Sequence, residues 1–258
     1  MLIKPLFDLA GSLPDAHASA SASVLLVKIA EENKYAESAA RPRPEKRMNR
    51  SNDIPNPSVL EIALASQSPR RRELLETAGF GFHLFPVKVS EIFDENLNPA
   101  EVVSHLATLK ARSAIEQNKP LKSRGYLLLT ADTLVFYEGT PLGKPKNRDE
   151  AMRFLRLLSA KTHSVMSGIC LWETGSTNFY TGVEETLVEF HPLTEGEIAA
   201  YVATGDPLDK AGAYGIQGQA SKFVSSYKGS KSNVVGLPME LLERAIKENG
   251  WNVRRRSP

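Results

Sequence analysis

The pattern of apolar and polar positions along the 258-residue chain changes character near residue 59. Residues 1–58 contain the low-complexity run HASASASV and the basic, proline-rich run RPRPEKRMNRSNDIPNP, neither of which has the period of a helix or a strand. From residue 59, short apolar runs alternate with segments of helical period. The pattern therefore predicts a disordered extension over 1–58, an ordered domain over 59–250 and a basic tail over 251–258.

Strand and helix signals alternate through this domain. Apolar runs and period-2 alternation predict strands over 59–66, 82–90, 126–139, 163–173 and 178–193, the last two antiparallel. Helical periodicity predicts helices over 69–79, 98–118, 147–160, 195–205 and 239–250. Asn98 with Glu101, and Thr194 with Glu197, have the spacing of a capping box. The order predicts one α/β domain with a mixed β-sheet flanked by helices, not a regular βαβ array.

The start of the helix over 69–79 has an unusual charge pattern. Ser68 is a candidate N-cap and Pro69 stands at the favoured first position, but Arg70, Arg71 and Arg72 follow. Because the N-terminal end of a helix already carries partial positive charge, acidic residues are the usual choice there. The three arginines therefore suggest that an anion is expected at this helix end.

Composition limits the kinds of partner. Lys and Arg total 32 against 30 Asp and Glu, a net charge of +2 that argues against wholesale nucleic-acid or membrane binding. The single cysteine excludes an internal disulfide, and the histidines show no zinc spacing. The chain has no run of eighteen apolar residues, so no membrane-spanning helix is predicted. We expect a cytoplasmic protein; organellar targeting by residues 1–58 is a minor alternative, which their acidic residues count against.

Asp132 is the first candidate for chemistry. It interrupts the apolar run LLLTADTLVF, where a buried carboxylate without partners would cost several kcal/mol. It should therefore meet a cation, a metal or a substrate, although it could also end the strand and cap a neighbour. Lys144 in PLGKP extends from a tight loop, but surface lysines are common.

Further candidates lie in loops. The run DKAGAYGIQG places three glycines around Lys210 and Gln217, which would let backbone amides approach a ligand, although it is not a Walker loop. Asp94 and Glu95 form either a solvated acidic turn or oxygen ligands for a hard cation. Basic groups, glycine-rich turns and carboxylates together favour phosphoryl chemistry. A serine hydrolase is disfavoured because neither GxSxG nor a Ser-His-Asp set is evident.

Six motifs in order give the chain a family resemblance: LASQSPRRRELL, ADTLV, GKP, LSAKTH, DKAGAYGIQG and NVVGLP. From about residue 60 to 246 the chain resembles the Maf family of nucleoside triphosphate pyrophosphatases. The resemblance implies a Maf or inosine-triphosphatase-like fold, elongated and two-lobed, with a deep central cleft. It also implies hydrolysis between the α and β phosphates with a divalent cation, Mg²⁺ or Mn²⁺.

The resemblance also implies residue roles. Asp132 matches the proton acceptor and a metal ligand, and Glu95 or Asp94 matches an acidic position near the metal. The positions tied to choice of base are Arg70, Thr133 and Gln217. The polar positions around the phosphates are Ser66, Arg71, Lys110, Lys144 and Lys210, with Lys144 and Lys210 assigned to catalysis.

The glycine-rich motif resembles the branch that prefers dTTP and UTP, and the family often accepts modified pyrimidine nucleotides as well. The predicted partner is a nucleoside triphosphate, with neither nucleic acid nor membrane, and a homodimer is common in the family. Two alternatives stay open. One is a nucleotide-binding regulator of division or stress with little turnover, and the other is a pyrophosphatase for non-pyrimidine nucleotides.

Overall fold

The computed structural model describes residues 59–94, 96–123 and 125–256. The extension predicted over residues 1–58 and the candidate metal ligand Glu95 lie outside these ranges. The helices are α2 (Pro69–Thr77), α3 (Pro99–Gln117), α4 (Arg148–Leu158), α5 (Glu195–Ala203), α6 (Lys231–Val235) and α7 (Met239–Glu248). The 3₁₀ helices are η1 (Lys119–Lys122), η2 (Asp206–Asp209), η3 (Ala211–Ala213) and η4 (Gly218–Phe223).

The strands form one mixed sheet in the order β2-β1-β3-β5-β6-β7, with β4 paired to β3. They are β1 (Glu61–Leu64), β2 (Phe82–Leu84), β3 (Tyr126–Tyr137), β4 (Thr140–Leu142), β5 (Thr162–Glu173), β6 (Phe179–Phe190) and β7 (Val224–Lys228). β1 is parallel to β2 and β3, whereas β3, β5 and β6 are antiparallel to one another in that order. The predicted mixed α/β architecture is therefore confirmed.

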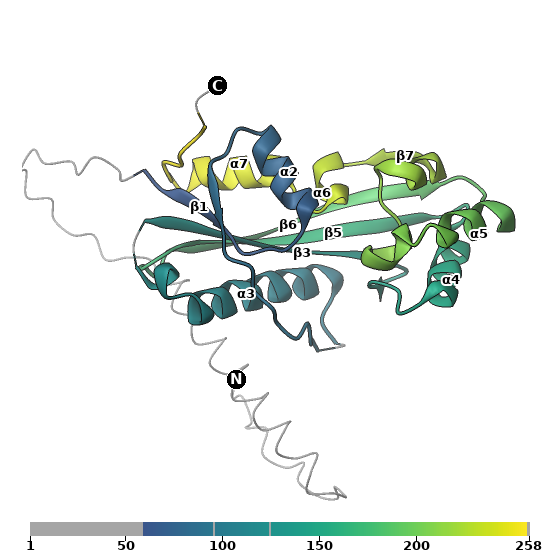
Figure 1. The fold of residues 1–258 in the computed structure, drawn as a ribbon, viewed down its shortest axis with the longest axis horizontal. Helices are drawn as coiled ribbons and strands as arrows, with labels where there is room; N and C mark the ends of the chain where they lie inside the picture. Colours follow the sequence, from purple (N-terminus) through teal and green to yellow (C-terminus); the bar gives the residue numbers. More distant parts are fainter. Residues whose placement is uncertain (1–58, 95, 124, 257–258) are drawn as a thin grey trace, which may run out of the picture. The chain divides into compact units, whose positions relative to one another are not determined.

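Helices cover both faces of the sheet (Figure 1). α3 lies along one face, and α2, α6 and α7 lie on the other. Successive side chains of a strand point to opposite faces, and β3 follows this rule: Leu127, Leu129 and Ala131 pack in the core with α2 and α7, while Leu128 packs against α3. This alternation assigns Asp132 to the α3 face and its neighbour Thr133 to the opposite one.

Close packing of α3 on the sheet depends on Gly168. This residue lies on β5 directly opposite Asp132 of β3. A Cβ atom at Gly168 would lie 2.2 Å from the carbonyl oxygen of Val103 in α3, so no larger residue fits without moving the helix. Thr130 adds a hydrogen bond of 2.7 Å from its hydroxyl to the carbonyl of Ala107. The helix is thereby held directly over the middle of β3.

Local capping explains where the main helices begin. Asn98 Oδ1 accepts from the N–H of Glu101 at 3.0 Å and Glu101 Oε2 accepts from the N–H of Asn98 at 2.9 Å, as the spacing predicted. Thr194 begins α5 in the same reciprocal way. Ser68 is the N-cap of α2, as predicted, but its side chain makes no capping hydrogen bond.

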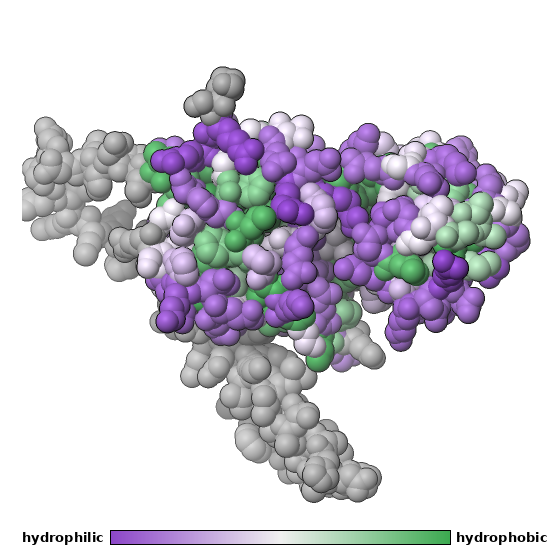
Figure 2. All heavy atoms as spheres, in the orientation of Figure 1, coloured by the Kyte–Doolittle hydropathy of each residue, from purple (hydrophilic) through white to green (hydrophobic). Residues whose placement is uncertain are grey.

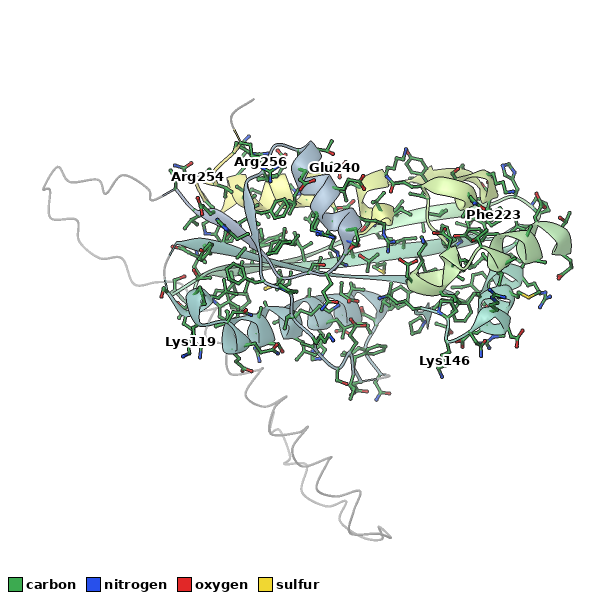
Figure 3. The ribbon with its side chains drawn as sticks, in the orientation of Figure 1. Lys119, Lys146, Phe223, Glu240, Arg254 and Arg256 are labelled. Carbon is green, nitrogen blue, oxygen red and sulfur yellow. The ribbon has the colours of Figure 1, made fainter. Side chains whose placement is uncertain are left out.

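Residues 251–256, predicted as a basic tail, continue the fold. Trp251 is buried in the core beside α7. The N–H of Arg254 donates to the carbonyl of Leu60 at 2.8 Å, and the N–H of Arg256 donates to the carbonyl of Gly79, also at 2.8 Å. Both arginines lie on the C-terminal segment beside β1 (Figure 3). Charge dominates the sequence of this segment, but backbone pairing and one tryptophan decide its position.

Hydrophilic residues cover most of the domain face shown in Figure 2, with smaller hydrophobic areas between them. Within the described ranges, no helix has both the length and the apolar character needed to cross a membrane.

Candidate active site

The predicted site residues converge on one pocket of about 800 Å³. All those within the described ranges line it except Asp94, and they come from separate parts of the chain. They are Ser66, Arg70, Arg71, Lys110, Asp132, Thr133, Lys144, Lys210 and Gln217. The volume lies within the range of small-molecule sites.

The pocket lies at a gap in the sheet. β1 pairs with β3 only as far as Leu129, and β4 pairs with β3 only from Val135. In the described part of the chain, residues 130–134 therefore have β5 as their only strand neighbour. Asp132 and Thr133, whose side chains leave opposite faces of β3, both reach the pocket across this unpaired edge. The gap is the reason that one site can use both faces.

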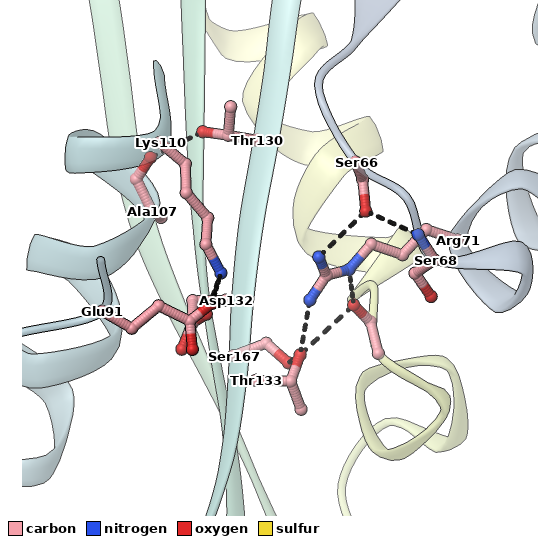
Figure 4. A network of polar contacts seen from close by, with 11 residues as sticks. Ser66, Ser68, Arg71, Glu91, Ala107, Lys110, Thr130, Asp132, Thr133 and Ser167 are labelled. Atoms are coloured by element: carbon pink, nitrogen blue, oxygen red, sulfur yellow. Dashed lines mark hydrogen bonds and ion pairs between the residues drawn. The ribbon is translucent and has the colours of Figure 1, made fainter. Parts of the chain in front are cut away.

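Lys110 lies between two carboxylates on the α3 face (Figure 4). Its ammonium group donates to Asp132 Oδ1 and forms an ion pair of 2.7 Å with Glu91 Oε1. The side chains of Asp132 and Lys110 are only 6% and 14% exposed. Asp132 Oδ2 is also buried, and no described residue donates a hydrogen bond to it. Leaving a buried oxygen unpaired costs free energy, so this atom is positioned for a further group.

Glu91 carries a stable negative charge. Its partial burial would raise the pKa of the carboxyl group, but the hydrogen bond and charge of Lys110 hold this pKa below its usual range. The charges of Lys144 and Arg71 act in the same direction. Glu91 is therefore ionised at neutral pH, even though it faces a pocket.

Arg71 lies on the opposite side of β3 with neutral partners (Figure 4). Its Nε donates to Gly236 O at 2.7 Å, Nη1 to Ser66 Oγ at 3.2 Å and Nη2 to Thr133 Oγ1 at 3.3 Å. Gly236 ends α6 at φ 127°, a conformation that favours glycine and turns its carbonyl toward Arg71. Burial lowers the pKa of Arg71 and the charge of Asp132 opposes this shift, but a guanidinium stays protonated. A partly buried cation whose hydrogen-bond acceptors are uncharged is a favourable place for an anion.

Arg70 and Lys210 are paired with aspartates at the edge of the pocket. Arg70 Nη1 lies 3.2 Å from Asp209 Oδ2. Lys210 Nζ donates to Asp206 O at 2.8 Å, and to Asp206 Oδ1 and Asp209 Oδ1 at 2.7 Å each. An ammonium has three donors and all three are used. Phosphate binding by Lys210 stays a prediction. It would require one aspartate to move away from the ammonium group and free a donor.

Lys144 and Gln217 are exposed side chains in loops that line the pocket. Arg72, the third arginine of α2, is not among the lining residues. Beside Gln217 the wall becomes apolar. This part is formed by Val135, Val165, Tyr214, Ile216, Val234 and Val235. The pocket is thus lined by charged groups around Asp132, and near Gln217 it has an apolar side that adjoins the aspartate-paired Lys210.

Among the described residues of the segment 85–97, the acidic residue that lines the pocket is Glu91, which the sequence did not single out. The alternative Asp94 is exposed, and its Oδ1 accepts hydrogen bonds of 2.9 and 2.8 Å from Asn96. Glu91 lies in an irregular stretch between β2 and α3, so no periodicity marks it. Its partner Lys110 is distant in sequence, and only the packing of α3 brings them together.

Comparisons with known proteins agree with the motifs. The family model described as Maf-like protein matches residues 61–249. A dTTP/UTP pyrophosphatase of Bdellovibrio bacteriovorus is 45% identical, with 72% of this chain and 96% of that protein covered. A dTTP/UTP pyrophosphatase of Bacillus thuringiensis subsp. konkukian is 47% identical, with coverage of 73% and 95%. The chain therefore belongs to the Maf-like protein family.

A solved structure of the Staphylococcus aureus Ham1 protein also aligns with this chain. It covers 73% of this chain and 99% of its own, with 14% identity and a TM-score of 0.44. This likeness is too distant to support an argument about the site.

Proposed function

We propose that this protein hydrolyses dTTP and UTP to the nucleoside monophosphate and pyrophosphate. The observation that carries the proposal is the buried Oδ2 of Asp132, which accepts no hydrogen bond from the described residues and lies in a pocket also lined by Arg70, Arg71, Lys110 and Lys144. The relatives of 45% and 47% identity, both named dTTP/UTP pyrophosphatase, support the reaction and the choice of base.

The two sides of the pocket match the two parts of such a substrate. The triphosphate would lie on the charged side, against Arg71, Lys144 and the N-terminus of α2, whose backbone N–H groups favour anions. The nucleoside would lie on the apolar side, where Gln217 can donate and accept hydrogen bonds at the edge of a pyrimidine. This arrangement also explains why arginines follow the N-cap of α2, because Arg71 points into the site and would contact the triphosphate.

The proposed reaction uses Asp132 as the proton acceptor. The oxygen of a water molecule forms a bond to the α phosphorus while the bond from that phosphorus to the α–β bridging oxygen breaks. The bridging oxygen leaves with pyrophosphate, and a proton of the water passes to Asp132 Oδ2. Lys110 fixes the carboxyl group through its hydrogen bond to Oδ1. Arg71 and Lys144 neutralise the charge that develops on the phosphates.

The residues present fit a divalent cation shared with the substrate. Among the described residues, no three or more His, Cys, Asp or Glu side chains gather as one metal-binding group. Mg²⁺, however, is commonly held by one or two carboxylates together with phosphates and water, and the carboxylates of Glu91 and Asp132 would supply these. When bound, the cation would make a coordinated water more acidic and offset phosphate charge.

A pyrophosphate-release screen of the purified full chain tests the proposal. The substrates are dTTP, UTP, CTP, GTP, 7-methyl-GTP and ITP, each with Mg²⁺ or Mn²⁺. We expect release from dTTP and UTP. Release from purine nucleotides alone would contradict the choice of base, and binding of dTTP without turnover would favour the regulator hypothesis instead.

Asp132→Asn tests the proton acceptor. This nearly isosteric change should lower kcat by about 10²-fold or more while dTTP still binds, because it removes a general base. The matched control is Asp149→Asn on the first turn of α4, an exposed residue away from the pocket. Undiminished turnover by Asp132→Asn would show that another group accepts the proton.

A further inference from the structure

Side chains hold in place the segment that leads to Gln217. Tyr214, Gly215, Ile216 and Gln217 all line the apolar side of the pocket. Apart from bonds internal to helices and strands, no backbone-to-backbone hydrogen bond within the described ranges involves Tyr214, Gly215 or Ile216. The position of this segment therefore depends on what its side chains contact.

The main side-chain contact is a buried hydrogen bond between Tyr214 and His163. His163 lies on β5 and is 3% exposed, and its Nε2 is 2.6 Å from the hydroxyl oxygen of Tyr214, which is itself 4% exposed. Phe190 packs edge-on against both rings, with centroids 4.9 Å from His163 and 4.7 Å from Tyr214. Burial lowers the pKa of His163 to about 4, so the imidazole is neutral at neutral pH and pairs with a neutral hydroxyl.

The turn just before Tyr214 is strained and needs such support. Ala213 has φ 62° and Gly212 has φ 66°, a region that costs a residue with a Cβ atom free energy. A Cβ at Gly212 would lie 2.8 Å from Val135 Cγ2, and the N–H of Gly212 donates to Gly143 O at 3.1 Å. Strained turns persist where surrounding contacts determine them, and the hydrogen bond between Tyr214 and His163 is such a contact.

We propose that His163 is a positioning residue for nucleoside recognition, holding residues 214–217 through Tyr214 so that they contact the base and sugar. His163 is not among the residues that line the pocket, so its effect passes through Tyr214. The inference rests on the proposed function, because it assigns the apolar side of the pocket to the nucleoside.

The test compares His163→Leu with His163→Gln, since a glutamine amide can still donate a hydrogen bond to the tyrosine hydroxyl. Two quantities are measured for each full-length variant: kcat and KM for dTTP, and the inhibition constant of inorganic tripolyphosphate, which has no nucleoside. Tyr214→Phe removes the same hydrogen bond from its other end. Leu158→Ala, buried in the same core without lining the pocket, is the control for lost stability.

We expect His163→Leu and Tyr214→Phe to raise KM for dTTP about five- to tenfold, the range for one neutral hydrogen bond. Their kcat and their inhibition by tripolyphosphate should stay close to wild type, and His163→Gln should restore most of the affinity. Leu158→Ala should lower the melting temperature without changing KM.

An unchanged KM in a folded His163→Leu or Tyr214→Phe variant would overturn the inference, as would an equal loss of tripolyphosphate inhibition. If the wild type releases no pyrophosphate from dTTP or UTP, the proposed function fails instead. In that case, calorimetry measures the dissociation constant of dTTP for the wild type and for His163→Leu. Equal dissociation constants would refute the positioning role.

Discussion

Replacing Gly168 by alanine would test whether the approach of α3 to the sheet sets the contact between Lys110 and Asp132. The new Cβ would lie 2.2 Å from the oxygen and 2.5 Å from the carbon of the Val103 carbonyl. Carbon-to-oxygen contacts are rarely closer than about 3.3 Å, and a helix backbone cannot rotate away as a side chain can. α3 must therefore withdraw by about 1 Å over Asp132.

Two losses follow from this displacement. Overpacking of this kind costs typically about 1–3 kcal/mol, which lowers the melting temperature by about 2–4 °C for each kcal/mol in a domain of this size. Lys110 moves with the helix, and a misplacement near 1 Å in a catalytic group can reduce turnover by about 10²-fold. Activity should therefore fall further than the loss of stability alone explains.

Calorimetry and pyrophosphate release from dTTP measure the two effects, at a temperature where Gly168→Ala is still folded. Gly196→Ala is the matched control, because nothing lies within 4 Å of a Cβ atom there and the residue is within α5. This control should gain about 0.4–1 kcal/mol of stability and keep its activity. Wild-type melting temperature and kcat in Gly168→Ala would refute the reasoning.

Two further predictions concern the α2 arginines and the buried histidine. Arg71→Ala should weaken dTTP binding by about 1.5–3 kcal/mol, the worth of one charged hydrogen bond, whereas Arg72→Ala should not; equal calorimetric losses would contradict the inward orientation of Arg71. For His163, whose pKa falls from 6.5 to about 4 on folding, the unfolded chain binds the proton first as pH decreases. The contribution of His163 should therefore destabilise the fold by about 3 kcal/mol between pH 6.5 and pH 4. In denaturant titrations over this range, the wild type should lose about this much more stability than His163→Gln.

Elements with strong local signals were predictable from the sequence. The capping boxes at Asn98 and Thr194 fixed where α3 and α5 begin. The long apolar run predicted β3, and the polar residue within it marked Asp132 as a site residue. β4 and α6 were missed because they span only three and five residues. β7 was missed because most of its side chains are exposed and polar.

The candidate site was predictable as a set of residues but not as an arrangement. Motif by motif, the sequence identified cations and a carboxylate suited to a triphosphate. It could not show that Lys210 is enclosed by two aspartates, or that Arg71 meets only uncharged acceptors. These facts depend on which way a helix faces and on loops that meet only after folding.

The sequence by itself determined the local elements and the chemical inventory of the site, because caps, periodicity and residue type act over a few positions. Only the tertiary structure decided how these groups meet. The partner strands β1 and β4 leave a gap along β3, so Asp132 and Thr133 reach one pocket from opposite faces. Gly168 lets α3 approach until Lys110 touches both Asp132 and Glu91. Such contacts join residues distant along the chain, and their geometry is fixed by packing rather than by any local pattern.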